Sequence, residues 1–374
     1  MNSISFSIFQ LFIYIFLMSN TFTDEEKQLL DNSVEFMEKC EKGILIDKDS
    51  CKFIDSPKIS VIIPVYSASA TIKKAIRSIQ NQTLKEIEII LYDDASPDNS
   101  FNIMKELQEE DPRIKLYKNE NNRGVFYTRL SASKTAKGKY IMYLDNDDMF
   151  SRIDILNIVY GEIEKTGHDI IEFNGYSTHD YHLINKDKNI KSTSIYNKET
   201  EFTQPELSRV RIKKINENLV EINDSYLWGK IIKNDLMQKV INIIGEENYG
   251  KKMLYHDDDC VNYILFKNAK SFKYINVYGI FYYTNQESIT HSKRPFQTCF
   301  DIINYFNFLF DHSDEDEKDN IAIRFTNEWD FKVTDGLNED NTNYAKKVIM
   351  KFMECEAINA DIKDKIKNIC KIKF

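Results

Sequence analysis

Several features that would place this chain of 374 residues in a common class are missing from its sequence. The six cysteines are scattered, at Cys40, Cys51, Cys260, Cys299, Cys355 and Cys370. They form no CxxC pair or Cys/His cluster with the spacing of a zinc site. Lysine and arginine (50) are outnumbered by aspartate and glutamate (59), and the formal charge of −9 disfavours a nucleic acid as partner. The chain has no internal repeat, and its 42% hydrophobic residues are enough for a substantial core.

Charge is also absent from the N-terminus. The first 23 residues carry no charged side chain, and Leu11 to Met18 is continuously apolar. This is typical of a signal peptide or a signal anchor, although a basic n-region is missing and the apolar run is shorter than the roughly 20 residues of a membrane span. We expect residues 1–23 to direct the chain into the secretory pathway (ER/Golgi lumen) or to attach it to a membrane. In an oxidising compartment Cys40 and Cys51 could form a small disulfide loop, and free thiols are the alternative.

The texture of the sequence changes at Pro57. Residues 24–56 are charged and mixed, and we interpret them as a stem or linker that contains a helix. Beyond them, β-branched runs alternate with segments of helical spacing. The expected strands are 59–64, 87–92, 114–117 and 140–144, and the expected helices are 72–80, 98–107 and 125–136. This alternation predicts an α/β fold with a Rossmann-like, mostly parallel sheet flanked by helices.

The second half of the chain is less regular. We divide the expected domain, 57–290, into a first half (57–150) and a second half (151–290). The second half contains a polar, irregular insertion at 176–223. Residues 291–374 are expected to form a C-terminal helical extension.

The most informative stretch is Asp145-Asn-Asp-Asp148, which follows the apolar run that ends at Leu144. Crowded carboxylates repel one another and are costly to bury unless a cation lies among them. The carboxyl ends of parallel strands meet at one edge of a sheet, where α/β proteins bind their ligands. Polar loops also follow the two earlier strands, at 66–69 and 93–99. The pattern predicts a divalent metal that holds a diphosphate, and an acidic turn is the alternative.

Five segments resemble, in order and spacing, the motifs of glycosyltransferase family 2. They are Ile59-Ser-Val-Ile-Ile-Pro-Val-Tyr66, Tyr92-Asp-Asp-Ala-Ser-Pro-Asp98, Asn122-Arg-Gly124 with Arg129, Gly138-Lys-Tyr-Ile141 and Leu144-Asp-Asn-Asp-Asp148. The resemblance implies the GT-A type of fold, a nucleotide-diphosphate sugar (a UDP-sugar) as donor, and Mn²⁺ or Mg²⁺. It also implies transfer of a hexosyl or N-acetylhexosaminyl group, with inversion, to a glycan, protein or lipid acceptor.

The resemblance also implies roles for residues of the first half. The Pro64, Val65 and Tyr66 positions match the loop that holds the nucleotide base. Asp93 or Asp94 matches the acidic residue that reads the base or ribose, and Arg129 matches a position near the donor phosphates. Asp145 and Asp147 match the metal-binding pair, with Asp145 also near the ribose, and Asp148 matches the acidic residue beside them. The alternatives are a packed Tyr66, an Asx turn at Asp93 and a solvated Arg129.

In the second half, His256-Asp-Asp-Asp259 resembles the motif that carries the catalytic base. Aligned with the helix that follows, Asp257 takes the place of the family's Glu and Asp258 that of the base, with Asp259 as rival. A sugar hydroxyl needs a carboxylate to remove its proton as it attacks. The alternative for these residues is an acidic helix N-terminus. Trp228 and Lys230 resemble an acceptor-side pair.

The sequence departs from the family pattern at three positions, where Leu130 replaces Asn, Ala95 replaces Gly and Asp257 replaces Glu. Two other functions are weighed. One is a degenerate module that binds nucleotide-sugar or glycan without transfer, which the intact acidic motifs disfavour. The other is a nucleotidyltransferase, which would need a Gly-rich, basic loop after the first strand, where this chain has Val65-Tyr-Ser-Ala-Ser69.

Overall fold

A computed structural model of the protein describes most of the chain. The described residues are 23–184, 191–192, 198–204, 212–216, 219–222, 226–249, 253, 256–284, 295–332 and 339–370. Residues 1–22, which contain nearly all of the predicted signal segment, lie outside them. Within the described part of the chain, no helix has the length and apolar character needed to cross a membrane.

The first half of the chain folds as the alternating pattern predicts. In order, its elements are α2 (Asp24–Glu41), η1 (Lys48–Ser50), β1 (Ile59–Val65), α3 (Ile72–Gln80), β2 (Ile87–Asp93), α4 (Ser100–Glu110), β3 (Ile114–Lys118), α5 (Val125–Lys134), β4 (Tyr140–Tyr143) and β5 (Met149–Phe150). The four expected strands and three expected helices are all present, with bounds that differ by a few residues. The strong β-branched runs and helical spacing explain this agreement, because each buried element had to keep its apolar period.

The second half adds elements that the sequence pattern showed less clearly. In order, they are α6 (Ile155–Thr166), β6 (Ile170–Thr178), η2 (Tyr181–Leu183), β7 (Lys191–Ser192), β8 (Thr200–Thr203), β9 (Ile212–Asn216), β10 (Leu219–Ile222), β11 (Lys230–Lys233), α8 (Asn234–Ile244), α9 (Glu246–Tyr249), α10 (Asp257–Asn268) and β12 (Ser271–Tyr283). The segment expected to be an irregular insertion thus contains short strands. Among the described residues, β7 pairs with β6 and β8 pairs with β12. The residues of β8 alternate between half-buried and exposed, so β8 lacks the apolar run of a central strand.

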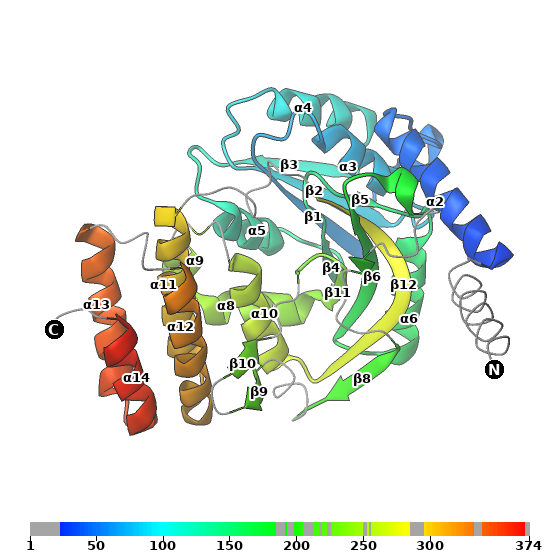
Figure 1. Ribbon diagram of the computed structural model, residues 1–374. Helices are drawn as coiled ribbons and strands as arrows, with labels where there is room; N and C mark the ends of the chain where they lie inside the picture. Colours follow the sequence, from blue (N-terminus) through cyan, green and yellow to red (C-terminus); the bar gives the residue numbers. More distant parts are fainter. Residues whose placement is uncertain are drawn as a thin grey trace, which may run out of the picture.

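The sheet is mixed and mostly parallel, in the order β3-β2-β1-β4-β11-β6-β12-β5 (Figure 1). β1 is parallel to both β2 and β4, with Ile59 opposite Ile87 and Tyr140. β11 enters antiparallel between β4 and β6, whereas β12 is parallel to β6. The predicted α/β fold with a mostly parallel sheet is therefore confirmed. The loops after β1, β2 and β4 lie at one edge of the sheet.

Helices cover both faces of this sheet (Figure 1). On one face, Val61 and Ile63 of β1 pack in a cluster with Ile76 of α3 and Leu156 of α6. On the other face, Ile62 belongs to a cluster with residues of α5, α8 and α10. The alternation of neighbouring β1 side chains between the two clusters is what a strand buried on both faces requires.

The C-terminal elements extend the second of these clusters. They are α11 (Pro295–His312), η4 (Glu315–Glu317), α12 (Lys318–Lys332), α13 (Glu339–Glu354) and α14 (Ala360–Cys370). Phe306, Phe325 and Phe352, from α11, α12 and α13, pack in one cluster with the α10 side of the domain. The predicted C-terminal helical extension is thus present, and it shares the domain's core.

The segment predicted to be a stem or linker, 24–56, packs on the domain. α2 begins with a capping box formed by Thr23 and Glu26 and lies against α3. The side chain of Asn81 accepts a hydrogen bond from the Ile46 amide at 2.8 Å and donates one to the Ile44 carbonyl at 2.9 Å. Phe36 and Met37 of α2 share a cluster with residues of β5 and β12. Because Phe36 and Met37 would be exposed to water in a free linker, their burial favours packing of this segment on the domain.

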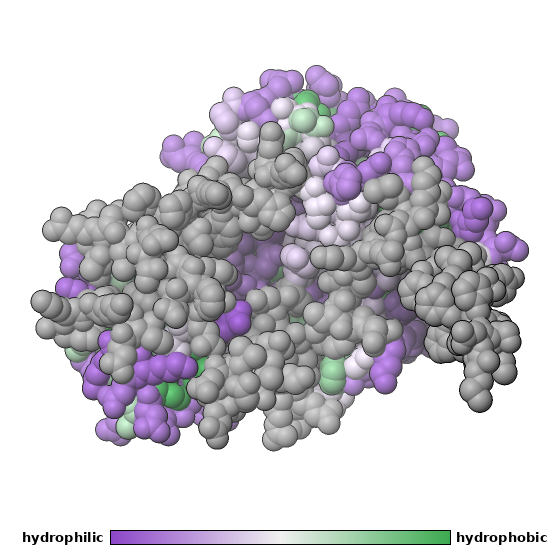
Figure 2. All heavy atoms as spheres, viewed as in Figure 1, coloured by the Kyte–Doolittle hydropathy of each residue, from purple (hydrophilic) through white to green (hydrophobic). Residues whose placement is uncertain are grey.

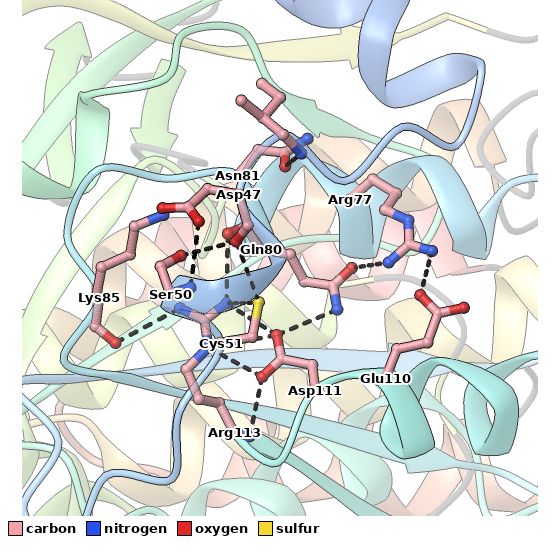
Figure 3. A network of polar contacts seen from close by, with 11 residues as sticks. Asp47, Ser50, Cys51, Arg77, Gln80, Asn81, Lys85, Glu110, Asp111 and Arg113 are labelled. Carbon is pink, nitrogen blue, oxygen red and sulfur yellow. Dashed lines mark hydrogen bonds and ion pairs between the residues drawn. The ribbon is translucent and has the colours of Figure 1, made fainter.

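A polar network joins the end of this segment to the domain (Figure 3). Arg113 is buried and donates to Asp111 at 2.8 Å and to the Cys51 sulfur at 3.3 Å. Cys40 and Cys51 are free thiols, which decides against the disulfide loop. Cys40 is buried, and burial raises the pKa of its thiol to about 12. Its thiol lies within hydrogen-bond distance of the Asn81 amide.

Candidate active site

The loop after β1 carries the residues predicted to hold the nucleotide base. Pro64 and Val65 are buried at the end of the strand, and Tyr66 is 46% exposed directly after it. The next residue, Ser67, has a positive φ of 52°. Its amide donates to the Ser96 hydroxyl at 3.1 Å, so the loop after β1 is held against the loop after β2. Tyr66 is thus presented to solvent at the carboxyl edge of the sheet, which is where the prediction placed it.

Two further bonds between these loops involve Asp98 and Ser100. The Ser69 amide donates to the Asp98 carboxylate at 2.9 Å, and the Ala68 amide donates to the Ser100 hydroxyl at 2.8 Å. Burial acts to raise the pKa of Asp98, but hydrogen bonds from Ser100 and Ser69 outweigh it and lower the pKa to about 2. Ala95 in the same loop has φ of 57°, in the left-handed region that favours glycine. Ala95, which replaces the family's glycine, therefore lies at a turn whose backbone conformation favours glycine.

The two adjacent aspartates at the end of β2, Asp93 and Asp94, are both buried and both accept hydrogen bonds within the chain. Asp93 accepts from the Ser96 amide at 3.2 Å, which is the Asx turn considered as the alternative. The Asp94 carboxylate accepts from the amides of Arg123 and Gly124, at 2.7 and 2.8 Å, and from the Asn119 side chain at 2.7 Å. Asp94 thus holds the loop that leads into α5. Sequence reasoning did not single out Asn119, because no motif surrounds it.

The acidic run after β4 is crowded and partly desolvated. Burial is the main cause that raises the pKa of Asp145, to about 6, and the charges of Asp258 and Asp147 add to it. Burial also raises the pKa of Asp147. Asp148 is fully buried and accepts from the Tyr283 amide at 2.9 Å. Its second carboxylate oxygen has no hydrogen-bond partner among the described residues, and burial, followed by the charges of Asp147 and Asp145, raises its pKa.

Arg129 connects this run to the second half of the domain. Arg129 is 4% exposed, and its guanidinium donates to Asp145 at 3.0 Å from one nitrogen. The other terminal nitrogen donates to both Asp257 and Asp258. Burial alone would lower the pKa of Arg129, but the three carboxylates more than offset it and raise the pKa. The residues expected on the donor side and on the acceptor side therefore meet at one cation.

The three aspartates at the start of α10 have different surroundings. Burial raises the pKa of Asp257, against the opposing effect of Arg129. Asp258 is the more exposed of the two that Arg129 contacts, with 21% of its side chain accessible against 11%. Asp259 instead lies 2.8 Å from the ring nitrogen of His256, and that ring stacks on Tyr305 of α11. Asp258 is therefore the one that combines exposure with a place in the Arg129 cluster.

The predicted acceptor-side pair, Trp228 and Lys230, is buried. The Lys230 ammonium lies 3.2 Å from Glu172 and donates to the Tyr226 carbonyl. The indole of Trp228 stacks on the rings of Tyr226 and Tyr282, two residues that the sequence analysis did not single out. The pattern Tyr226-x-Trp228 in the sequence could have indicated the contact between Tyr226 and Trp228. Tyr282 could not be found in that way, because it lies 54 residues after Trp228 and reaches it only through the fold of β12.

The acidic run is a candidate site for a divalent cation. Among the residues that the structure describes, no group of three or more His, Cys, Asp or Glu side chains is arranged to hold a metal ion. Mg²⁺ and similar cations, however, are commonly held by one or two carboxylates together with substrate phosphates and water. Asp145 and Asp147, crowded and partly desolvated beside the unsatisfied oxygen of Asp148, fit that arrangement. On the face shown in Figure 2, hydrophilic side chains are visible in a hollow beside α5.

Comparison with known proteins shows the family to which the chain belongs. Residues 60–219 match the family model "Glycosyl transferase family 2". WfaP of Escherichia coli, named as a UDP-Glc:alpha-D-GlcNAc-diphosphoundecaprenol beta-1,3-glucosyltransferase, is 30% identical over 200 residues, which are 50% of this chain and 74% of WfaP. The chain therefore belongs to glycosyltransferase family 2.

Two further similarities define how far the likeness extends. The glycosyltransferase GlyA of Streptococcus pneumoniae is 30% identical over 222 residues, which are 55% of this chain but only 29% of GlyA. The structure of Staphylococcus aureus TarS 1–349 in complex with UDP-GlcNAc matches with a TM-score of 0.57, 16% identity and 82% of each chain covered. At that identity TarS shows the fold alone, and it confirms the GT-A type of α/β fold.

Proposed function

We propose that this protein transfers a sugar from a nucleotide-diphosphate sugar, a UDP-sugar, to an acceptor hydroxyl with inversion at the anomeric carbon. The observation that carries the proposal is the Arg129 cluster. It brings Asp145, after β4, against Asp257 and Asp258, more than 100 residues later, at the edge where the nucleotide loops end. The printed name of WfaP, which specifies a UDP-sugar, supports the choice of donor.

The first half is proposed to bind the donor. The exposed Tyr66 ring lies against the base, with Pro64 and Val65 shaping the loop, and Asp93 and Asp94 hold the neighbouring loops in place beside the base and ribose. Asp145 and Asp147 would hold Mn²⁺ or Mg²⁺, which would supply positive charge for the departing diphosphate. Arg129, next to Asp145, is placed to add a second positive charge beside the donor phosphates.

The second half is proposed to supply the base. As the acceptor oxygen forms its bond to the anomeric carbon, its proton passes to a carboxylate oxygen of Asp258. The bond from the anomeric carbon to the diphosphate breaks on the opposite face, and its electron pair leaves with the nucleotide. The Leu227 amide, 3.4 Å from one Asp258 oxygen, and Arg129 on the other orient this carboxylate. Asp257, buried behind it, helps to hold Arg129.

The test is donor binding and donor turnover by the full chain across a panel of UDP- and GDP-sugars, with Mn²⁺ and with EDTA. Metal-dependent hydrolysis or transfer of one donor is expected. Asp147→Ala should lose binding and turnover together. Asp258→Asn should keep donor binding and lose turnover by about 10²–10⁴-fold, the usual contribution of a general base.

Asp259→Asn is the matched control, because it is the same substitution one residue away. Normal turnover in Asp258→Asn, with loss in Asp259→Asn, would move the base to Asp259. Donor binding with neither hydrolysis nor transfer to any acceptor in a screen of glycans, lipids and peptides would instead favour a binding module. Equal turnover with and without metal would contradict the role given to Asp145 and Asp147.

The place of action is proposed from the N-terminal sequence and from the printed name of a relative. The uncharged N-terminal stretch supports entry into the secretory pathway or attachment to a membrane, and the diphosphoundecaprenol acceptor in the name of WfaP is consistent with work at a membrane surface. Fractionation of cells that express the full chain would test it, since recovery only in the soluble cytosolic fraction would contradict it.

A further inference from the structure

A lysine that the sequence analysis did not single out lies beside the acidic run. Lys74 is on the first turn of α3, which covers one face of the sheet, whereas Arg129 is on α5, which covers the other. The ammonium nitrogen of Lys74 lies 4.7 Å from the centre of the Tyr283 ring, and the Tyr283 amide donates to Asp148 at 2.9 Å. Lys74 and Arg129 therefore approach the run from opposite faces of the sheet.

The direction of the Lys74 side chain follows from the packing of α3. This helix packs against β5 (Met149–Phe150), which begins directly after Asp148 (Figure 1). The hydroxyl of Ser78 accepts a hydrogen bond from the Phe150 amide at 3.1 Å. Lys74 and Ser78 are four residues apart, so they lie on the same face of the helix. The face that carries Lys74 is therefore the one that is bonded to the end of the acidic run.

The charge of Lys74 reaches two carboxylates of the run. Burial raises the pKa of Asp147 and of Asp148, and the positive charge of Lys74 acts against burial at both. At Asp145 burial is again the largest effect, and there Arg129 is the cation that opposes it. The two cations thus act on different parts of the run, and Lys74 acts on its later residues.

Lys74 differs from Arg129 in having hydrogen-bond donors that are not in use. The guanidinium of Arg129 already donates to three carboxylates. The Lys74 ammonium has three N–H groups, and it makes no hydrogen bond or ion pair with any residue that the structure describes. The side chain is half-buried and rests on the Tyr283 ring, so its position is restricted while its donors stay available.

We propose that Lys74 donates to the second phosphate of the nucleotide-diphosphate donor, the phosphate farther from the ribose. Asp145 is the residue expected next to the ribose, and Lys74 acts on the other end of the run. An ammonium on a flexible side chain forms strong, charge-assisted hydrogen bonds to phosphate oxygens. Negative charge grows on the diphosphate as its bond to the anomeric carbon breaks, so a cation at this phosphate also favours its departure.

This inference rests on the proposed function and adds a residue to it. Lys74 lies between the first two of the five segments that resemble the family, so the motifs did not indicate it. The alternative is a counter-ion that only neutralises Asp147 and Asp148 in the folded chain. A dedicated counter-ion would form an ion pair, and within the described ranges Lys74 forms none with either carboxylate. The available donors therefore favour an external anion.

The experiment compares the binding of UDP and UMP, and of GDP and GMP in parallel, to the full chain by calorimetry in Mn²⁺. The monophosphate keeps the base, the ribose and one phosphate, so the ratio of the two affinities isolates the second phosphate. Lys74→Met should weaken binding of the diphosphate about 10- to 100-fold, the effect of losing one hydrogen bond to a charged group. Binding of the monophosphate should be nearly unchanged, which also shows that the variant is folded.

Lys73→Met is the matched control, because it removes the same charge one residue earlier. Lys73 is exposed, and its side chain lies near Gly43 of the N-terminal segment, so this variant should bind both nucleotides as the wild type does. Lys74→Arg keeps the charge and should retain most of the affinity for the diphosphate. Tyr283→Leu removes the ring beneath Lys74 but keeps the amide that bonds Asp148, and it should weaken diphosphate binding about two- to fivefold.

Mn²⁺ binding to the nucleotide-free protein, followed by electron paramagnetic resonance, separates a direct contact from damage to the acidic run. Removal of a nearby positive charge should leave Mn²⁺ binding equal or tighter in Lys74→Met. Weaker Mn²⁺ binding in that variant would make Lys74 a support of the run and would overturn the inference. The same ratio of diphosphate to monophosphate affinity in Lys74→Met and wild type would overturn it as well, while leaving the proposed function intact. A wild-type protein that binds no nucleotide would refute the proposed function itself, and the inference with it.

Discussion

Removing the guanidinium of Arg129 tests the cluster on which the proposed function rests. In Arg129→Met the three carboxylates of Asp145, Asp257 and Asp258 would face one another without a cation, in a site where Arg129 is only 4% exposed. Breaking a buried ion pair by removing one partner typically costs about 3–5 kcal/mol of the free energy of unfolding. Methionine retains much of the apolar volume, so the loss should come mainly from charge.

The loss should depend on pH in a definite direction. Folding raises the pKa of Asp145 from 3.8 to about 6, so between these values the native protein binds more protons than the unfolded chain. Stability therefore falls as the pH rises through this window. Without Arg129 the pKa values of Asp145 and Asp257 should rise further, and the fall should become larger and extend to higher pH.

The assay is urea unfolding in EDTA, at about pH 5 and about pH 8, for wild type and Arg129→Met. We expect the loss caused by the substitution to be clearly larger at the higher pH. Arg77→Met is the matched control, because Arg77 is equally buried but contacts one carboxylate, Glu110, that is 40% exposed. Its loss should be similar at both values. Equal losses for Arg129→Met at both pH values, or full stability of that variant, would refute the cluster.

Two further substitutions test the scaffold of the site. Asp94→Asn removes the charge from an acceptor of two backbone amides and the Asn119 side chain, and should lower the free energy of unfolding by about 1.5–3 kcal/mol and weaken donor binding, as measured by urea unfolding and calorimetry. An Asp94→Asn protein with wild-type stability would show that these bonds contribute little. Gly138→Ala would place a Cβ atom 2.4 Å from the backbone nitrogen of Ser60 in β1. We expect a loss of at least about 1–3 kcal/mol. Gly161→Ala, in α6 with open space around the Cβ position, is its control and should be neutral or stabilising.

Local sequence patterns were sufficient to predict the first four strands and the helices between them. Each of these strands had to remain apolar, and each helix had to keep a buried face, so their periods were readable before any contact was known. The same local logic placed Tyr66, Asp93 and Asp145 directly after strands, and therefore at one edge of the sheet. The resemblance of a short motif to the family pattern was enough to predict that Asp257 and Asp258 belong to the site.

Tertiary structure decided what those residues touch. That Arg129 joins Asp145 to Asp257 and Asp258, that residues 24–56 pack on the domain, and that Cys40 and Cys51 are free thiols all depend on contacts between segments far apart in the chain. The pairing of Tyr226 with Tyr282 is of the same kind, because β12 brings the second ring to Trp228. Local sequence patterns record which face of an element is buried, but they carry no information about which distant side chain covers it, and the chemistry of this site depends on those distant partners.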